Sequence, residues 1–139
     1  MMISTRGRYA LRVMLDLAQD ESGSYVPLDD IARREGMSEK YLESIIAPLS
    51  RSGIVEAARG KGGGYRLAET PDHYSAYDIL SLAESGLSTV SCLGKGGCDK
   101  ADACRTLPLW QEVNVLLENY LRRVTLADLL QGAVPSALQ

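Results

Sequence analysis

A run of glycines at 60–64, placed between two short β-type segments, constrains the fold of this chain more than any other feature. The segments are 54–58, with the sequence IVEAA, and 65–68, with the sequence YRLA. Two such segments around a glycine turn predict a β-hairpin. A phosphate-binding loop is the rival interpretation, but Lys61 is followed by Gly62 rather than Ser or Thr, and no helix pattern begins there.

Three helices are expected before this hairpin. Residues 5–19 repeat apolar side chains at the spacing of one helical face. Pro27, followed closely by two acidic residues, predicts a second helix that stops at Gly36. Ser38 is expected to cap a third helix that ends at Gly53. Two short helices joined by a tight turn suit a helix-turn-helix, and a hairpin directly after them forms a wing.

Three arginines crowd the start of the first helix, namely Arg6, Arg8 and Arg12. Cations at that end oppose the helix dipole, and a bound polyanion would reverse the penalty. The cluster therefore indicates phosphate contact, and a solvated arginine face is the alternative from these residues alone.

After the hairpin, Ser75 opens a further helix through about residue 84 with a capping-box pattern. A long helix follows over 107–124, and Thr125 is expected to cap a last short one. Part of the long helix has apolar side chains spaced 4, 3 and 4 apart, as in a coiled-coil seam: Leu109, Val113, Leu116 and Tyr120. We expect this seam to form a dimer, and a single internal core helix is the alternative.

Composition narrows the class of protein. The chain has 139 residues, with 45% apolar, 24% charged and no Phe, as expected for a small globular protein with an aliphatic core. Its apolar runs are far shorter than the roughly 18 residues that span a bilayer, and its start lacks a signal-peptide core, so no membrane partner and a cytoplasmic location are expected. The formal net charge is −3, but residues 1–66 carry +1 and residues 67–139 carry −4.

The three cysteines, Cys92, Cys98 and Cys104, form a C-x5-C-x5-C pattern on a glycine-rich segment. Thiolates are soft ligands, and glycines let a backbone wrap around a metal centre. Nearby cations that can offset negative charge are Lys95, Lys100 and Arg105.

Several interpretations of the cysteines compete. A structural zinc site normally uses four ligands, often in C-x2-C pairs, and this spacing is absent. A disulfide with a spare thiol does not suit the cytosol, and inert core cysteines do not suit a loop rich in Gly and Lys. An iron–sulfur cluster with three cysteines and one other ligand is preferred, although the spacing alone leaves the choice open.

The chain resembles the IscR/NsrR/CymR family of dimeric winged helix-turn-helix regulators, and the IscR branch most closely. The resemblance covers roughly residues 2–131. The segments that carry it are TRGRYAL at 5–11, VPL at 26–28 with IA at 31–32, MS at 37–38 with YLE at 41–43, RGxGGGY at 59–65, CxGKGGC at 92–98 with Cys104, and LW at 109–110.

The resemblance implies a mostly α fold with a small β-hairpin wing, in which two winged domains flank a pair of long crossed helices. It implies a homodimer that reads a palindromic site in double-stranded promoter DNA, and a 2Fe–2S cluster, held by the three cysteines, that changes DNA affinity. Arg59 is expected in the minor groove. The residues expected at DNA are Arg6, Arg8, Ser38, Lys40, Tyr41, Glu43, Arg51, Arg59 and Lys61.

The chain departs from the IscR branch at the fourth cluster ligand, because Leu107 stands where that branch has a histidine. The sole histidine, His73, precedes the cysteine segment. Arg8 and Arg12, in the region from which some relatives recruit a partner's side chain, are poor ligands. The remaining choices are Asp99, Asp102, Asp16 or water.

The expected organisation is a DNA-binding domain at 1–84, a cysteine loop at 85–106, a dimerisation helix with a short terminal helix at 107–131, and a tail at 132–139. No catalytic grouping of Ser, His and Asp or of Cys and His is visible, so an enzyme is not expected. The sequence predicts a transcription regulator that senses iron–sulfur status, redox or nitric oxide. Two alternatives stay open: a cluster-free thiol-redox regulator, and a winged-helix module that binds protein.

Overall fold

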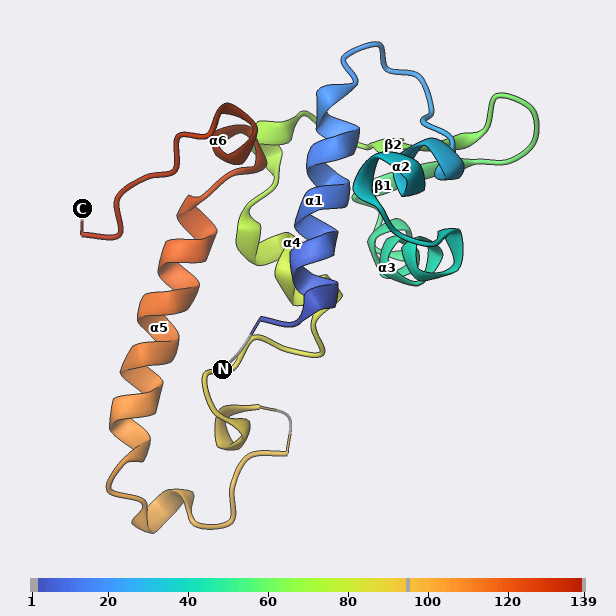
Figure 1. The fold of residues 1–139 in the computed structure, drawn as a ribbon. Helices are drawn as coiled ribbons and strands as arrows, with labels where there is room; N and C mark the ends of the chain where they lie inside the picture. Colours follow the sequence, from blue (N-terminus) through green and yellow to red (C-terminus); the bar gives the residue numbers. More distant parts are fainter. Residues whose placement is uncertain (1–2, 95, 139) are drawn as a thin grey trace.

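Five helices and a hairpin gather around one core, and a long helix stands beside them, as the computed structural model shows for residues 3–94 and 96–138 (Figure 1). The elements are α1 (Thr5–Gln19), α2 (Leu28–Glu35), α3 (Glu39–Arg51), β1 (Val55–Ala58), β2 (Gly64–Leu67), α4 (Ala76–Ala83), α5 (Leu107–Arg123) and α6 (Leu126–Gln131). Short 3-10 turns lie at Pro71–His73, Ser91–Leu93 and Ala101–Ala103. The predicted fold class, mostly α with a β wing, is confirmed.

Side-chain caps set the starts of α3, α4 and α6 at the predicted positions. The Ser38 hydroxyl accepts a hydrogen bond from the backbone N–H of Tyr41 at 3.1 Å and so begins α3. Reciprocal capping boxes open α4, through Ser75 and Asp78, and α6, through Thr125 and Asp128.

The wing, defined as β1, β2 and the turn at 59–63, is an antiparallel hairpin in which Val55 pairs with Leu67. Its second strand is also tied to the loop before α2. The backbone N–H of Val26 donates to the carbonyl of Tyr65 at 2.7 Å, and the Tyr65 N–H donates back at 2.9 Å. Gly64 permits this approach, because its φ is +149° and a Cβ there would lie 2.1 Å from the Val26 carbonyl oxygen.

Aliphatic side chains fill the core between α1, α3 and α4, as expected for a chain without Phe. Burying such side chains is the main source of stability in a small domain. The largest fully buried ones are Met14, Ile31, Leu42, Ile45, Ile46, Leu49, Ile79, Leu126, Val13 and Val55.

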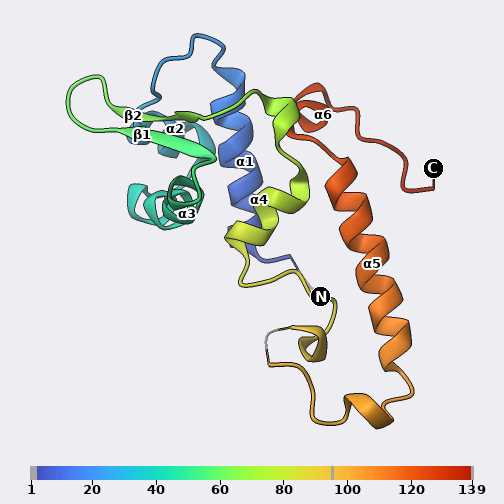
Figure 2. The same cartoon turned by 180° about the vertical axis from the view of Figure 1, so that it is seen from behind.

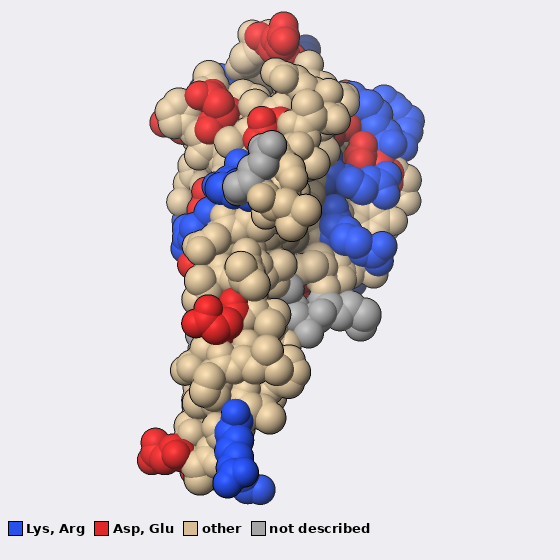
Figure 3. All heavy atoms as spheres, turned by 90° about the vertical axis from the view of Figure 1, so that its left-hand side faces the viewer, with Lys and Arg blue, Asp and Glu red and all other residues tan. Residues whose placement is uncertain are grey.

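Helix α5 packs along α4 but has no buried residue, so it is not an internal core helix (Figure 2). Leu109 is 55% exposed, Val113 36% and Leu116 70%. Charged side chains are sparse over the face of the molecule that carries α5 (Figure 3). No helix in the described part of the chain is both long and apolar enough to cross a membrane.

Candidate nucleic-acid interface and cysteine loop

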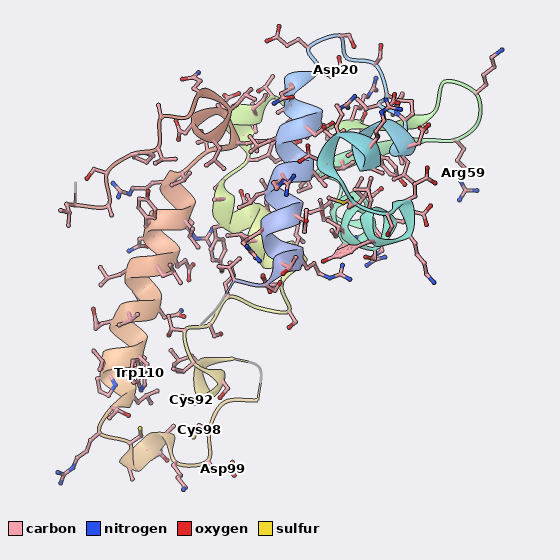
Figure 4. The ribbon with its side chains drawn as sticks, viewed as in Figure 1. Asp20, Arg59, Cys92, Cys98, Asp99 and Trp110 are labelled. Carbon is pink, nitrogen blue, oxygen red and sulfur yellow. The ribbon has the colours of Figure 1, made fainter. Side chains whose placement is uncertain are left out.

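A groove of about 660 Å³ runs between α3 and the wing. Glu43 and Arg51 line it from α3, and Arg59 and Tyr65 line it from the hairpin. The Arg59 side chain projects outward from the wing (Figure 4). Lys61 is exposed at the turn of the same hairpin. The structure thus brings two cations, Arg51 of α3 and Arg59 of the wing, to one groove. Such cations can bind the phosphates of a nucleic-acid backbone.

The predicted residues at the start of α3 differ in how free they are to reach a ligand. Lys40 and Glu43 are exposed. Tyr41 is half-buried, and its ring packs edge-on against Tyr9 of α1 with centroids 6.0 Å apart. The Ser38 hydroxyl caps α3, so it both holds the helix and stands at its exposed end.

Two of the three arginines of α1 bond to other helices of the protein. The Arg6 guanidinium donates to the carbonyl oxygen of Ser44 at 2.7 Å and to its hydroxyl at 3.3 Å, which places it against α3. Arg12 pairs with Glu35 of α2 at 3.1 Å. Arg8 is exposed and donates to the Thr5 hydroxyl. Sequence reasoning did not identify Ser44 as the partner of Arg6, because a serine within a helix carries no distinctive signal.

The cysteine loop, residues 85–106, lies away from the wing, between the ends of α4 and α5 (Figure 4). Cys92 and Cys104 are half-buried, Cys98 is exposed, and all three are free thiols. The Thr106 hydroxyl lies 3.3 Å from the Cys104 sulfur, and this hydrogen bond lowers the pKa of the Cys104 thiol from its ordinary value. A lowered pKa favours the thiolate, which is the form that binds metals and reacts with oxidants.

The donor chemistry of the loop suits an iron–sulfur cluster, because it offers three accessible sulfurs on a glycine-rich backbone. Within residues 3–94 and 96–138, no three His, Cys, Asp or Glu side chains converge as a metal site. A fit therefore requires the loop to close around the cluster. Lys95, predicted to offset charge, lies outside the described residues.

The residues considered for the fourth ligand differ in how available they are to a cluster. Leu107 is the first residue of α5 and offers no donor atom. Asp16 is buried and bonded to Arg34 of α2, so it is not available to a cluster. His73 lies in a turn outside the loop, beside Thr70. Asp99 and Asp102 remain exposed within the loop.

The entry to the loop is fastened to α5 by residues that the sequence analysis did not single out. The Thr89 backbone N–H donates to Asn114 Oδ1 at 2.9 Å, and the Thr89 hydroxyl donates to the Trp110 carbonyl oxygen at 3.3 Å. Asn114, a polar side chain within an apolar stretch of helix, was the available signal. The segment just before Cys92 is therefore held to the long helix.

Comparisons with known proteins agree with this geometry. The HTH-type transcriptional regulator IscR of Escherichia coli O1:K1 / APEC is 36% identical over 132 residues, which are 95% of this chain and 82% of that protein. The structure of CymR, the global cysteine regulator of B. subtilis, matches with a TM-score of 0.76 and 33% identity, covering 96% of this chain and 98% of that one. T. potens IscR matches with a TM-score of 0.72 and 36% identity, covering 95% and 88%.

The sequence pattern of the Rrf2 family, described as an iron-dependent transcriptional regulator, matches residues 3–132. The relatives are named as regulators of transcription, so the chain is a regulator and not an enzyme. A winged helix-turn-helix with a groove between α3 and the hairpin is the architecture that such a regulator needs. The chain belongs to the Rrf2 family of transcriptional regulators.

Proposed function

We propose that two copies of this chain bind a palindromic promoter site in double-stranded DNA, and that a 2Fe–2S cluster on Cys92, Cys98 and Cys104 controls their affinity. The observation that carries the proposal is the groove between α3 and the wing, where Arg51 and Arg59 line the walls. Recognition of a duplex needs an exposed helix and cations at a spacing that rigid elements fix.

Each DNA-facing residue has a role that its chemistry suits. Arg59 at the wing enters the minor groove, where narrow width strengthens attraction for a guanidinium. Glu43 on α3 accepts a hydrogen bond from cytosine N4, and Lys40 reaches a base edge or a phosphate. Arg51 and Lys61, exposed at the two sides of the interface, bind phosphates, and Arg8 binds one beyond the start of α1.

The partner on α5 is a second copy of the chain. Leu109, Val113 and Leu116 expose one apolar row that the chain itself leaves uncovered. A contiguous exposed apolar face marks an interface. Tyr120 continues the row at its C-terminal end, where its hydroxyl donates to the Pro135 carbonyl oxygen at 3.0 Å. The exposed row supports α5 as the dimerisation helix beside a DNA-binding unit at 1–84, whereas the short terminal helix α6 buries Leu126 in the core of that unit.

The cysteine loop is the sensor. Its three thiols are free and accessible. A cluster bound by all three would fix the conformation of the loop, whose entry is already bonded to α5 through Thr89. The kinship with IscR, at 36% identity, supports a cluster as the group that binds them. Asp99, Asp102 or water supplies the fourth ligand in place of Leu107.

A cluster-free thiol-redox regulator is the second candidate, favoured by one observation. The Cys104 thiol has a lowered pKa because of its hydrogen bond with Thr106, and a thiolate is the species that oxidants attack. The kinship with CymR, named as a cysteine regulator, fits this alternative.

Anaerobic purification separates the two candidates. A brown protein that contains iron and acid-labile sulfide, and whose visible absorption is lost in Cys98→Ala, supports the cluster. A colourless, iron-free protein whose DNA affinity still changes on thiol oxidation supports direct redox sensing.

A gel-shift titration at two salt concentrations tests DNA binding itself. Affinity for the selected duplex is expected to fall steeply with salt, because phosphate contacts release counterions. Arg59→Ala is expected to weaken specific binding by about 1–3 kcal/mol, whereas Arg122→Ala, on α5, leaves it unchanged. Absence of binding in every cluster state would favour a protein-binding module.

A further inference from the structure

The carboxylate of Glu84 lies where the cysteine loop begins and reaches the start of α1. Glu84 is the residue at which α4 ends. Its Oε1 atom accepts two hydrogen bonds from Ser4, one from the backbone N–H and one from the hydroxyl, each 2.8 Å long. The same Ser4 hydroxyl accepts from the Gly7 N–H and caps α1. A negative charge at this end of a helix is favourable, and here it faces a turn that carries Arg6 and Arg8.

Gly7 leaves the space that this contact needs, because it has no side chain. A Cβ at Gly7 would lie 2.3 Å from Glu84 Oε1, so any other residue would displace the carboxylate. The backbone of Gly7 is ordinary α-helix, so its conformation does not require glycine. A glycine inside a helix costs about 0.5–1 kcal/mol relative to alanine. The close approach of Glu84 is the physical reason for glycine at this position.

The same turn of α1 is bonded to the recognition helix, α3. Arg6, next to Gly7, donates from its guanidinium to the Ser44 carbonyl oxygen at 2.7 Å and to the Ser44 hydroxyl at 3.3 Å. Ser44 follows Glu43, one of the residues proposed to read DNA. Two groups of hydrogen bonds, joined by the backbone of residues 4–7, therefore link the entry of the cysteine loop to the middle of α3.

We propose that Glu84 is the positioning residue through which the cysteine loop acts on the recognition helix. Its carboxylate fixes the first turn of α1, and Arg6 of that turn fixes α3. Thr89 holds the same loop entry to α5, so a change in loop conformation is directed toward the DNA-binding unit through Glu84. The inference rests on the proposed function for the origin of the signal, but the mechanical link can be tested without a cluster.

The first experiment measures hydrogen exchange in the full-length, cluster-free protein. Glu84→Ala removes the acceptor, and Gly7→Ala keeps Glu84 but blocks its approach while raising helix propensity. Both are expected to speed exchange in peptides covering 5–9 and 39–46 by about fivefold, the factor that corresponds to one hydrogen bond. Glu21→Gln, in the exposed loop before α2, is the control and leaves both segments unchanged. Faster exchange in α1 alone, or in neither segment, would overturn the link.

The second experiment measures affinity for a duplex selected from a random library by the wild-type protein, with and without cluster. A wild-type ratio of about 5–150-fold is the usual size of a coupling between sites. In Glu84→Ala and Gly7→Ala the ratio is expected to approach one, with visible absorption unchanged. A wild-type ratio retained in both variants overturns the proposal. A wild-type ratio of one refutes cluster control instead, and hydrogen exchange then decides the link.

Discussion

The buried carboxylate of Asp16 in α1 accepts two hydrogen bonds from the guanidinium of Arg34 in α2. The Nε atom of Arg34 lies 2.9 Å from one carboxylate oxygen, and a terminal nitrogen lies 2.6 Å from the other. The Asp16 side chain is 2% exposed and that of Arg34 is 45% exposed. The hydrogen bond to Asp16 raises the pKa of Arg34, so the guanidinium stays charged beside the buried carboxylate.

Arg34→Ala is expected to lower the free energy of unfolding by about 2–3 kcal/mol, because it leaves a buried carboxylate without its partner. Arg33→Ala is the matched control, since Arg33 forms an exposed pair with Asp30. That change should cost less than about 1 kcal/mol. Urea unfolding measures both, and equal losses would show that the Asp16 pair is no more important than a surface pair.

Tyr74 is expected to make the free energy of unfolding depend on pH in the alkaline range. Its side chain is buried, its hydroxyl donates to the Ile54 carbonyl oxygen at 2.9 Å, and burial raises its pKa. A folded-state pKa above the unfolded value means that the stabilisation is complete below the unfolded pKa, about 10, and is lost as pH rises through the folded pKa.

The unfolding free energy is therefore expected to fall as pH increases above about 10, and Tyr74→Phe should flatten that fall. The same change should cost about 1–3 kcal/mol at neutral pH, because buried hydrogen-bonding groups lose their partner. Urea unfolding from pH 8 to pH 11 tests this, with Tyr25→Phe as the control that keeps the fall. An identical pH profile in Tyr74→Phe would contradict the assignment.

Leu116 is the most exposed member of the apolar row on α5. Leu116→Glu is expected to convert the proposed dimer to a folded monomer, because a carboxylate cannot be buried unpaired in an apolar interface. Val115→Glu is the matched control, since Val115 is 50% exposed and lies off the row. Sedimentation velocity measures both. A dimer that survives Leu116→Glu but not Val115→Glu would place the interface on another face of α5.

Cys104 is expected to be alkylated as a thiolate at lower pH than an ordinary cysteine, because its pKa is lowered by the Thr106 hydroxyl. In a protein whose other two cysteines are serine, Thr106→Val should move the midpoint of the iodoacetamide rate profile up toward the ordinary thiol value, about 8.5. Ser91→Ala removes a hydroxyl elsewhere on the loop and should leave the midpoint in place. An unmoved midpoint in Thr106→Val would remove the hydrogen bond as the cause.

Local signals explain which parts of the fold could be predicted. The caps at Ser38, Ser75 and Thr125 act within three residues of themselves, so the sequence contains both partners of each contact. The hairpin likewise depends on a glycine turn between adjacent segments. Its additional pairing with Val26 was not predicted, because that partner lies on a distant loop and only the folded chain brings it close.

The candidate site was harder to predict, for the same reason. Composition and spacing identified the three cysteines, and the family resemblance placed Lys40 and Glu43 among the residues expected at DNA. The bond between Arg6 and α3 could not be predicted from the sequence of α1, because the partner, Ser44, is 38 residues away. The glycine at position 7 has no turn to explain it, and its purpose is visible only once Glu84 is placed beside it.

The two backbone hydrogen bonds between Val26 and Tyr65 make the wing a partner of the loop before α2 as well as of its own hairpin. The angle between wing and recognition helix is consequently set before any duplex arrives, and little ordering entropy is lost on docking. A duplex whose grooves do not fit the wing and the recognition helix at that fixed angle must itself deform. Discrimination among promoters then depends partly on how easily each sequence bends, including at base pairs that the protein never touches.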